Sequence, residues 1–269
     1  ARCALGVVSY FRIANYLRPL EIDKTTHQFK SGAYFENAVR IYEFDSLLRE
    51  LIFKSISKIE ISLRTKMIQV FSLSHGSFLF LDMTLTSDEH LFLENISGVD
   101  RELHRSKEDF IKEHFKKYNK PAFPPAWKTL EVVSFGALSK MYYNFKDTKA
   151  KKTIARSFGL PQHVIFESWI ASIAALRNCC AHHARLWNRT FPVTPTLPDK
   201  LKGLWISDMA VPANKLYAQL CCIAYLTNNI HPVKNNFTTE LKSLIAAYPN
   251  VDVLSMGFPK DWKSQQLWK

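Results

Sequence analysis

A short segment near residue 180 combines side chains that suit phosphodiester chemistry. It reads Arg177-Asn178-Cys179-Cys180-Ala181-His182-His183-Ala184-Arg185-Leu186-Trp187-Asn188-Arg189. An arginine offers phosphate oxygens a planar fork of donors, and a histidine with an ordinary pKa near about 6.5 gives or takes a proton at neutral pH. The segment therefore predicts a site that binds a phosphate group and moves a proton.

The spacing of these residues predicts a polar ridge if the segment is helical. Asn178, His182, Arg185 and Arg189 follow one another at steps of 4, 3 and 4 residues, which places them on one helix face. Arg177 and His182 are five residues apart, or about 140° around a regular helix. Either the helix bends there, or two copies of the chain pool residues across a twofold axis, and we favour the second.

The charge of the chain indicates a polyanionic partner. The 36 Lys and Arg exceed the 24 Asp and Glu and leave a net charge of +12. Residues 149–202 hold nine basic residues against two acidic ones. Nucleic acid is the partner that such an excess favours, although a solvated basic face gives the same bias.

Composition also narrows the class of protein. A chain that is 47% hydrophobic and 22% charged is neither disordered, collagen-like nor an integral membrane protein. No apolar run approaches the roughly 20 residues of a spanning helix, and the five cysteines, without a secretory signal, fit a reducing compartment. We therefore expect a cytoplasmic protein without membrane contact. The chain begins with Ala1, which suggests that the natural N-terminus is absent.

Helical periodicity dominates the elements that must position the segment. The longest apolar stripe predicts a helix with Asp45 as its N-cap; its members are Leu48, Ile52, Ile56, Ile59, Leu63, Met67 and Val70. Caps and breakers predict further helices over 4–17, 87–118 (two, divided near Gly98 with Asp100 as a cap), 126–145 (interrupted at 134–136), 148–158, 161–177, 207–229 and 239–248. We expect little sheet and one all-α domain over 1–269, with an irregular tail at about 250–269.

The segment resembles the signature of a known superfamily. Arg177 and His182 fit the Arg-x4-6-His pattern of the HEPN ribonucleases. The residues around them, 177–189, are similar to the signature motif of the Abi-like abortive-infection proteins of the AbiD/AbiF type. Three other stretches resemble motifs of that family in the same order, namely Ser9–Tyr16, Phe44–Lys66 and Pro125–Lys140. The resemblance covers roughly residues 5–200.

The resemblance implies a HEPN-type helical bundle with extra helices and a toxic endoribonuclease of anti-phage defence. It implies RNA cleavage without a metal or other cofactor, a homodimer because one motif is present per chain, and restraint by a small structured non-coding RNA, as in a toxin–antitoxin pair. The implied catalytic residues are Arg177, Asn178, His182 and His183. The candidate RNA-binding residues are Arg185, Asn188 and Arg189 in the motif segment and Arg12, Lys58, Arg64 and Lys128 in the other motifs.

Less specific interpretations remain open beside this one. Arg177 and His182 could be structural, His183 could simply pack on Trp187, and Arg185 and Arg189 could stabilise the dimer instead of binding RNA. A zinc site is disfavoured because adjacent cysteines lack the usual C-x2-4-C spacing. At the level of function, the alternatives are a non-catalytic binder of structured RNA and a protein–protein scaffold.

Overall fold

The computed structural model describes residues 2–23, 25–208, 210–230 and 235–269. Within them the fold is all-α, as predicted, because the short hairpin of β1 (Glu21–Asp23) and β2 (Gln28–Phe29) contains the only strands. The helices are α1 (Arg2–Val7), α2 (Tyr10–Leu17), α3 (Phe35–His75), α4 (Glu89–Arg105), α5 (Asp109–Lys117), α6 (Ala126–Val132), α7 (Phe135–Asn144), α8 (Thr148–Ser157), α9 (His163–Ala181), α10 (Leu216–Asn229) and α11 (Phe237–Ala247). The tail beyond α11 contains short 3-10 turns.

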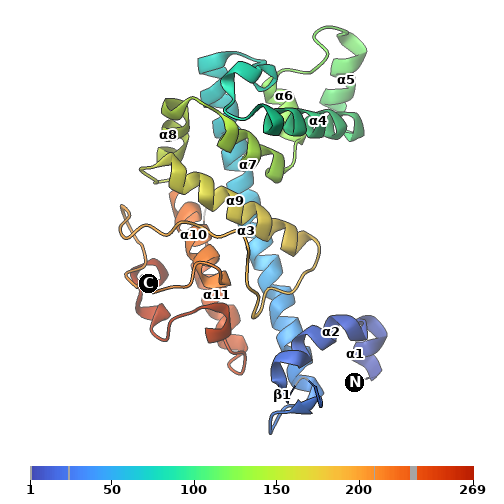
Figure 1. The fold of residues 1–269 in the computed structure, drawn as a ribbon, viewed down its shortest axis with the longest axis vertical. Coiled ribbons are helices and arrows are strands. Elements are labelled where there is room, and N and C mark those ends of the chain that lie inside the picture. Colours follow the sequence, from blue (N-terminus) through green and yellow to red (C-terminus); the bar gives the residue numbers. More distant parts are fainter. Residues whose placement is uncertain (1, 24, 209, 231–234) are drawn as a thin grey trace.

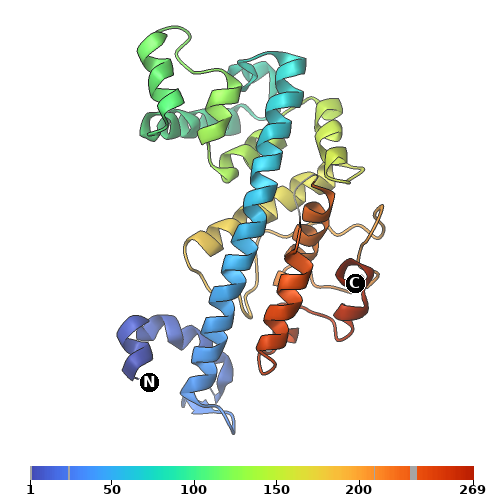
Figure 2. The same ribbon diagram turned by 180° about the vertical axis from the view of Figure 1, so that it is seen from behind.

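Helix α3 is the axis of the molecule. Its 41 residues span about 60 Å at the usual rise, and Figure 1 shows the other helices arranged along it. Helices α4–α8 gather around its C-terminal half, α10 and α11 lie beside its N-terminal half, and α1 and α2 lie near its start (Figures 1 and 2). Helix α9 crosses α3 and also packs on α7, α8 and α10.

The predicted N-cap of this long helix, Asp45, lies eleven residues beyond the observed N-cap, Tyr34. Helix α3 begins at Phe35, where the backbone amide of Tyr34 donates to the side chain of Asn37. Asp45 therefore lies inside the helix and is completely buried. A local capping rule could not identify this position, because the partners of the Asp45 carboxylate come from distant parts of the chain.

Three other predicted boundaries differ from the structure. Helices α1 and α2 are separate, with a break at residues 8–9. Helix α4 runs through Gly98, since Val99 and Leu103 on either side of the next turn are buried and burial offsets the roughly 1 kcal/mol penalty of a helical glycine. Helix α10 begins at Leu216 and not near residue 207, because Pro212 lacks the amide that a continuing helix requires.

The predicted interruption at 134–136 and the predicted cap at Asp147 agree with the structure. Ser134 divides α6 from α7 and caps α7 by accepting from the amide of Ala137. Asp147 caps α8 by accepting from the amide of Ala150 at 2.9 Å.

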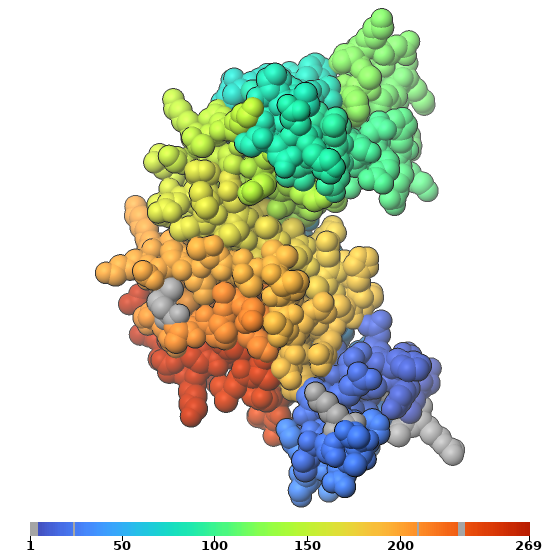
Figure 3. Space-filling model, in the orientation of Figure 1, coloured from blue at the N-terminus to red at the C-terminus, as the bar shows by residue number. Residues whose placement is uncertain are grey.

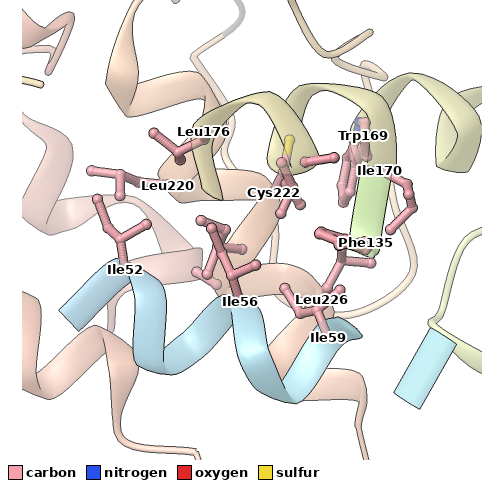
Figure 4. Close-up of a cluster of buried hydrophobic side chains, with 14 of the residues drawn as sticks. Ile52, Ile56, Ile59, Phe135, Trp169, Ile170, Leu176, Leu220, Cys222 and Leu226 are labelled. Atoms are coloured by element: carbon pink, nitrogen blue, oxygen red, sulfur yellow. The ribbon is translucent and has the colours of Figure 1, made fainter. Parts of the chain in front are cut away.

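Part of the hydrophobic core lies where α3, α7, α9 and α10 meet. Figure 4 shows one such cluster, with side chains from α3, α7, α9 and α10 pointing toward one another. They include Ile52, Ile56 and Ile59, Phe135, Trp169, Ile170 and Leu176, and Leu220, Cys222 and Leu226. Leu176 directly precedes Arg177, so the core fixes the helical turn that carries the arginine.

Helix α9 is long and apolar enough to cross a membrane by length and composition alone. This differs from the expectation that no apolar run in the sequence approaches that length. Half of the apolar window is buried inside the protein, as in the core helix of a folded domain.

Candidate functional site

The predicted polar ridge does not form, because α9 ends before the histidines. Ala181 is its last residue and His182 is the C-cap. The amides of His183 and Ala184 donate to the carbonyls of Cys180 and Cys179 at 3.0 and 2.8 Å, which is the hydrogen-bond pattern of a Schellman motif. His183 has φ = 54°, a left-handed conformation that usually favours glycine.

Arg177 lies one turn before this helix end, and the fold leaves its hydrogen-bonding groups available. Its side chain is 30% exposed, and its Nε lies 3.9 Å from Glu60 Oε2, beyond hydrogen-bonding distance. Its guanidinium carbon lies 5.9 Å from the centre of the Phe53 ring. The Nε is buried and has no hydrogen-bond partner in the described part of the chain.

Two hollows are lined in part by residues of α3 and of the motif segment. A polar hollow of about 880 Å³ is lined by Arg177 and Glu60 together with the α4–α5 connection and the end of α6. A second hollow of about 560 Å³ is lined by His183, Phe53 and neighbouring residues of α3. Phe53 therefore lines the same hollow as His183, and its ring also lies near the guanidinium of Arg177.

The other two catalytic candidates, Asn178 and His182, are exposed to solvent. Across the described residues, no hydrogen bond, ion pair or ring contact joins Arg177 to either histidine. Arg177 thus lies in the last turns of α9 and the histidines directly follow that helix, but no interaction joins them within a single chain.

The N-terminal segment touches the motif segment. Arg12 of α2 donates to the carbonyl of His183 at 2.6 Å, and Arg185 donates to the carbonyl of Asn15 at 2.7 Å. In the space-filling view, the N-terminal region meets the gold segment that follows α9 (Figure 3). Two arginines predicted to bind RNA therefore join the motif to α2.

The remaining candidates within the motif line the same side. Asn188, with φ = 50°, and Arg185 line a hollow of about 490 Å³ with residues of α2 and the hairpin. Arg189 lies over the ring of Phe191 at 5.8 Å and donates to the carbonyl of Arg185 at 3.4 Å. Both remain partly accessible.

The candidates in the other motifs differ sharply in accessibility. Arg64 is buried, and its guanidinium donates to the carbonyls of Leu130 and Glu131 at the end of α6 and to Glu60. Its donors are used inside the fold, which argues against the expected RNA contact and for a structural role. Lys58 is half-buried, and Lys128 donates to the carbonyl of Phe110 at 3.3 Å.

Sequence reasoning missed a buried polar group beneath the motif. Asp45 accepts from the hydroxyl of Tyr16, from Arg49 and from the backbone amides of Leu186 and Trp187. Burial raises the pKa of the Asp45 carboxyl, and these four donors oppose that rise. The i, i+4 spacing of Asp45 and Arg49 within an apolar stripe was the signal available in the sequence.

Burial shifts the pKa of two side chains in the motif segment, Cys180 and Arg185. It raises the pKa of the Cys180 thiol to about 12, so this sulfur stays protonated and unreactive at neutral pH. It lowers the pKa of Arg185, an arginine that remains cationic at neutral pH. Among the described residues, no three His, Cys, Asp or Glu side chains are grouped closely enough to hold a metal ion.

Comparison with known proteins places the chain in a family. No characterised protein and no solved structure matches it significantly. The sequence model of the family described as Abi-like protein matches residues 4–188, which is more than half of the chain and includes most of α1, α2–α9 and the turn that follows. The chain therefore belongs to the Abi-like protein family, whose name points to abortive-infection defence.

Proposed function

We propose that this protein is an endoribonuclease of the HEPN type that acts in abortive infection. The observation that carries the proposal is the state of Arg177, which lines a polar hollow and whose guanidinium has no hydrogen-bond acceptor among the described residues. Arg12, Arg49, Arg64 and Arg185, by contrast, donate to acceptors inside the protein. A half-buried arginine with available donors suits a phosphate ligand.

The proposed reaction uses the substrate's own hydroxyl as the nucleophile. His182 removes the proton from a ribose 2′-OH, and the oxygen attacks the adjacent phosphorus. The bond from phosphorus to the 5′ oxygen breaks, and that oxygen takes up a proton, which leaves a 2′,3′-cyclic phosphate and a 5′-OH. DNA lacks the 2′-OH and is not cleaved.

The other motif residues support this step. Arg177 holds the phosphate and stabilises the negative charge of the transition state. Asn178 orients the imidazole of His182 or donates to a phosphate oxygen, and His183 is a second candidate for proton transfer.

The active form is a homodimer in this proposal. Arg177 and His182 are not in contact within one chain, and a twofold axis would bring the arginine of one copy near the histidine of the other. Partly exposed apolar side chains close to the motif, such as Phe53 and Ile61 of α3 and Phe11 of α2, are suited to such an interface.

RNA is also the proposed restraining partner. The basic segment 149–202 and the accessible Arg189 and Asn188 suit a structured RNA that covers the site until infection. Deep sequencing of the RNA that copurifies with the protein tests this part of the proposal, and a single enriched short transcript is the expected result.

Cleavage of labelled RNA by the purified protein in EDTA tests the function. We expect cleavage by the wild type, loss of cleavage in His182→Ala, and no loss in His90→Ala, which removes an exposed histidine of α4. The products should carry 2′,3′-cyclic phosphate ends, and a substrate with a single 2′-deoxy nucleotide at the cleavage position should survive.

A second candidate is a non-catalytic binder of structured RNA, favoured by the net charge of +12. Salt-sensitive binding without cleavage by wild type and His182→Ala alike would establish that function and reject the nuclease.

A further inference from the structure

The turn at residues 184–187, which follows the two histidines, is hydrogen-bonded to the buried carboxylate of Asp45. Asp45 Oδ1 accepts from the amides of Trp187 and Leu186 at 2.7 and 3.1 Å. Asp45 Oδ2 accepts from the hydroxyl of Tyr16 at 2.7 Å and from Arg49 Nη1. Both Asp45 and Arg49 are almost completely buried, so this network is shielded from water.

The carbonyl side of the same turn is held as well. Arg49 reaches the carbonyl of Ala184 at 3.5 Å, and Arg12 donates to the carbonyl of His183 at 2.6 Å. Side chains of α2 and α3 therefore hold the carbonyls of His183 and Ala184 and the amides of Leu186 and Trp187. The left-handed backbone of His183 is a conformation that persists only when the surroundings determine it.

A buried ion pair is an inefficient way to stabilise a fold. Removing two charges from water offsets most of their attraction, and apolar residues of similar size often serve stability equally well. A carboxylate that accepts two consecutive amides does, however, fix the direction of a turn. Positional control of the histidines is the property that Asp45 supplies and an apolar residue would not.

We propose that Asp45 is a positioning residue for the nuclease site. Its buried carboxylate, held by Arg49 and Tyr16, fixes the 184–187 turn and thereby the orientation of His182 and His183 relative to the phosphate bound by Arg177. Asp45 does not touch the RNA. The inference rests on the proposed nuclease function and adds a group that the Arg–His motif does not contain.

The test compares Asp45→Asn with wild type and with Asp147→Asn. Asp147 also accepts a backbone amide, but it does so at the N-terminus of α8, away from the motif. All three proteins are assayed for single-turnover cleavage and for KM at a temperature at which they are folded, and amide hydrogen exchange is measured over residues 183–188.

We expect Asp45→Asn to lower the cleavage rate by about 10- to 100-fold, the effect of a small misplacement of a catalytic group. The KM for RNA should change little, and the amides of Leu186 and Trp187 should exchange faster. Asp147→Asn should match wild type in all three measurements. Tyr16→Phe, which removes one donor and retains the carboxylate, should give a smaller loss of rate and serves if Asp45→Asn does not fold.

Three outcomes oppose the proposal in distinguishable ways. An active wild type with unchanged cleavage rates in Asp45→Asn or, if that variant is unfolded, in Tyr16→Phe overturns the role of Asp45 and leaves the nuclease intact. A loss that appears only in KM assigns Asp45 to RNA binding and also overturns it. A wild type that cleaves no RNA overturns the nuclease function, and the positioning role falls with it.

Discussion

Arg177 and Arg64 lie near the same carboxylate, Glu60, yet the fold uses them differently. Arg64 is buried and donates to two backbone carbonyls at the end of α6. Arg177 is partly exposed and makes no hydrogen bond within the described residues. The first arginine therefore supports the fold, and the second is available to a ligand.

We expect Arg177→Ala to lower RNA cleavage by at least about 100-fold, since it removes charge stabilisation from the transition state. The melting temperature of Arg177→Ala should stay close to that of wild type. Arg64→Ala should lower the free energy of unfolding by about 1–3 kcal/mol, because buried carbonyls lose their donor. Thermal unfolding and cleavage assays on both variants check this. Equal melting-temperature losses in the two variants, with cleavage retained in Arg177→Ala, would make Arg177 structural.

His183 allows its backbone and its imidazole to be tested separately. Because its φ is 54°, His183→Gly should be more stable than His183→Ala by about 1 kcal/mol. If the imidazole takes part in catalysis, both variants lose cleavage to the same extent. Retained cleavage in His183→Gly alone would show that this position acts through the backbone. Denaturant unfolding and cleavage rates measure the two effects.

At the scale of elements, helix ends explain both the successes and the errors of the sequence interpretation. Asp147 and Ser134 are local caps followed by apolar periodicity, and the helices they begin were predicted correctly. Helix α9 ends without a glycine or proline, since His183 takes the left-handed position itself. No residue type marked that end, so the sequence extended the ridge to Arg189.

The cap of α8 predicts a pH dependence of stability. The amide of Ala150, and then His75, lower the pKa of Asp147 in the folded state. The stabilisation of the fold by the Asp147 carboxylate is therefore complete above the unfolded-state pKa of about 4. It is lost as the pH falls through the lower pKa that Asp147 has in the folded state. Asp147→Ala should be less stable than wild type by about 1 kcal/mol at pH 7. Urea unfolding over a pH series should show that difference shrinking below about pH 4, and a constant difference would contradict it.

At the scale of the whole molecule, the separation of Arg177 from His182 leads us to expect that the proposed activity depends on a second copy. Co-expression of Arg177→Ala with His182→Ala should restore cleavage, because half of all dimers then combine one variant of each kind and form one intact site. The recovery should approach about a quarter of wild-type activity if each site pairs an arginine with the partner's histidine. Each variant alone should stay inactive, and an inactive mixture that contains heterodimers would favour a site within one chain.

The sequence alone determined the features that depend on neighbouring residues. Apolar periodicity established the all-α fold, the capping residue Asp147 established a helix start, and the interruption at 134–136 was predicted, since these depend on contacts within a few positions. Arg177 and His182 could be identified as candidates from the sequence because they belong to one short motif.

Only the tertiary structure decided which polar groups are available. Asp45, predicted to be a helix cap, is instead buried, and two of its four donors are backbone amides more than a hundred positions away along the chain. The guanidinium of Arg64 donates to backbone carbonyls of α6, whereas the guanidinium of Arg177 makes no hydrogen bond to a described residue. Hydrogen-bond partners that are distant in sequence leave no local pattern, so the roles of these three residues depend on how the helices pack.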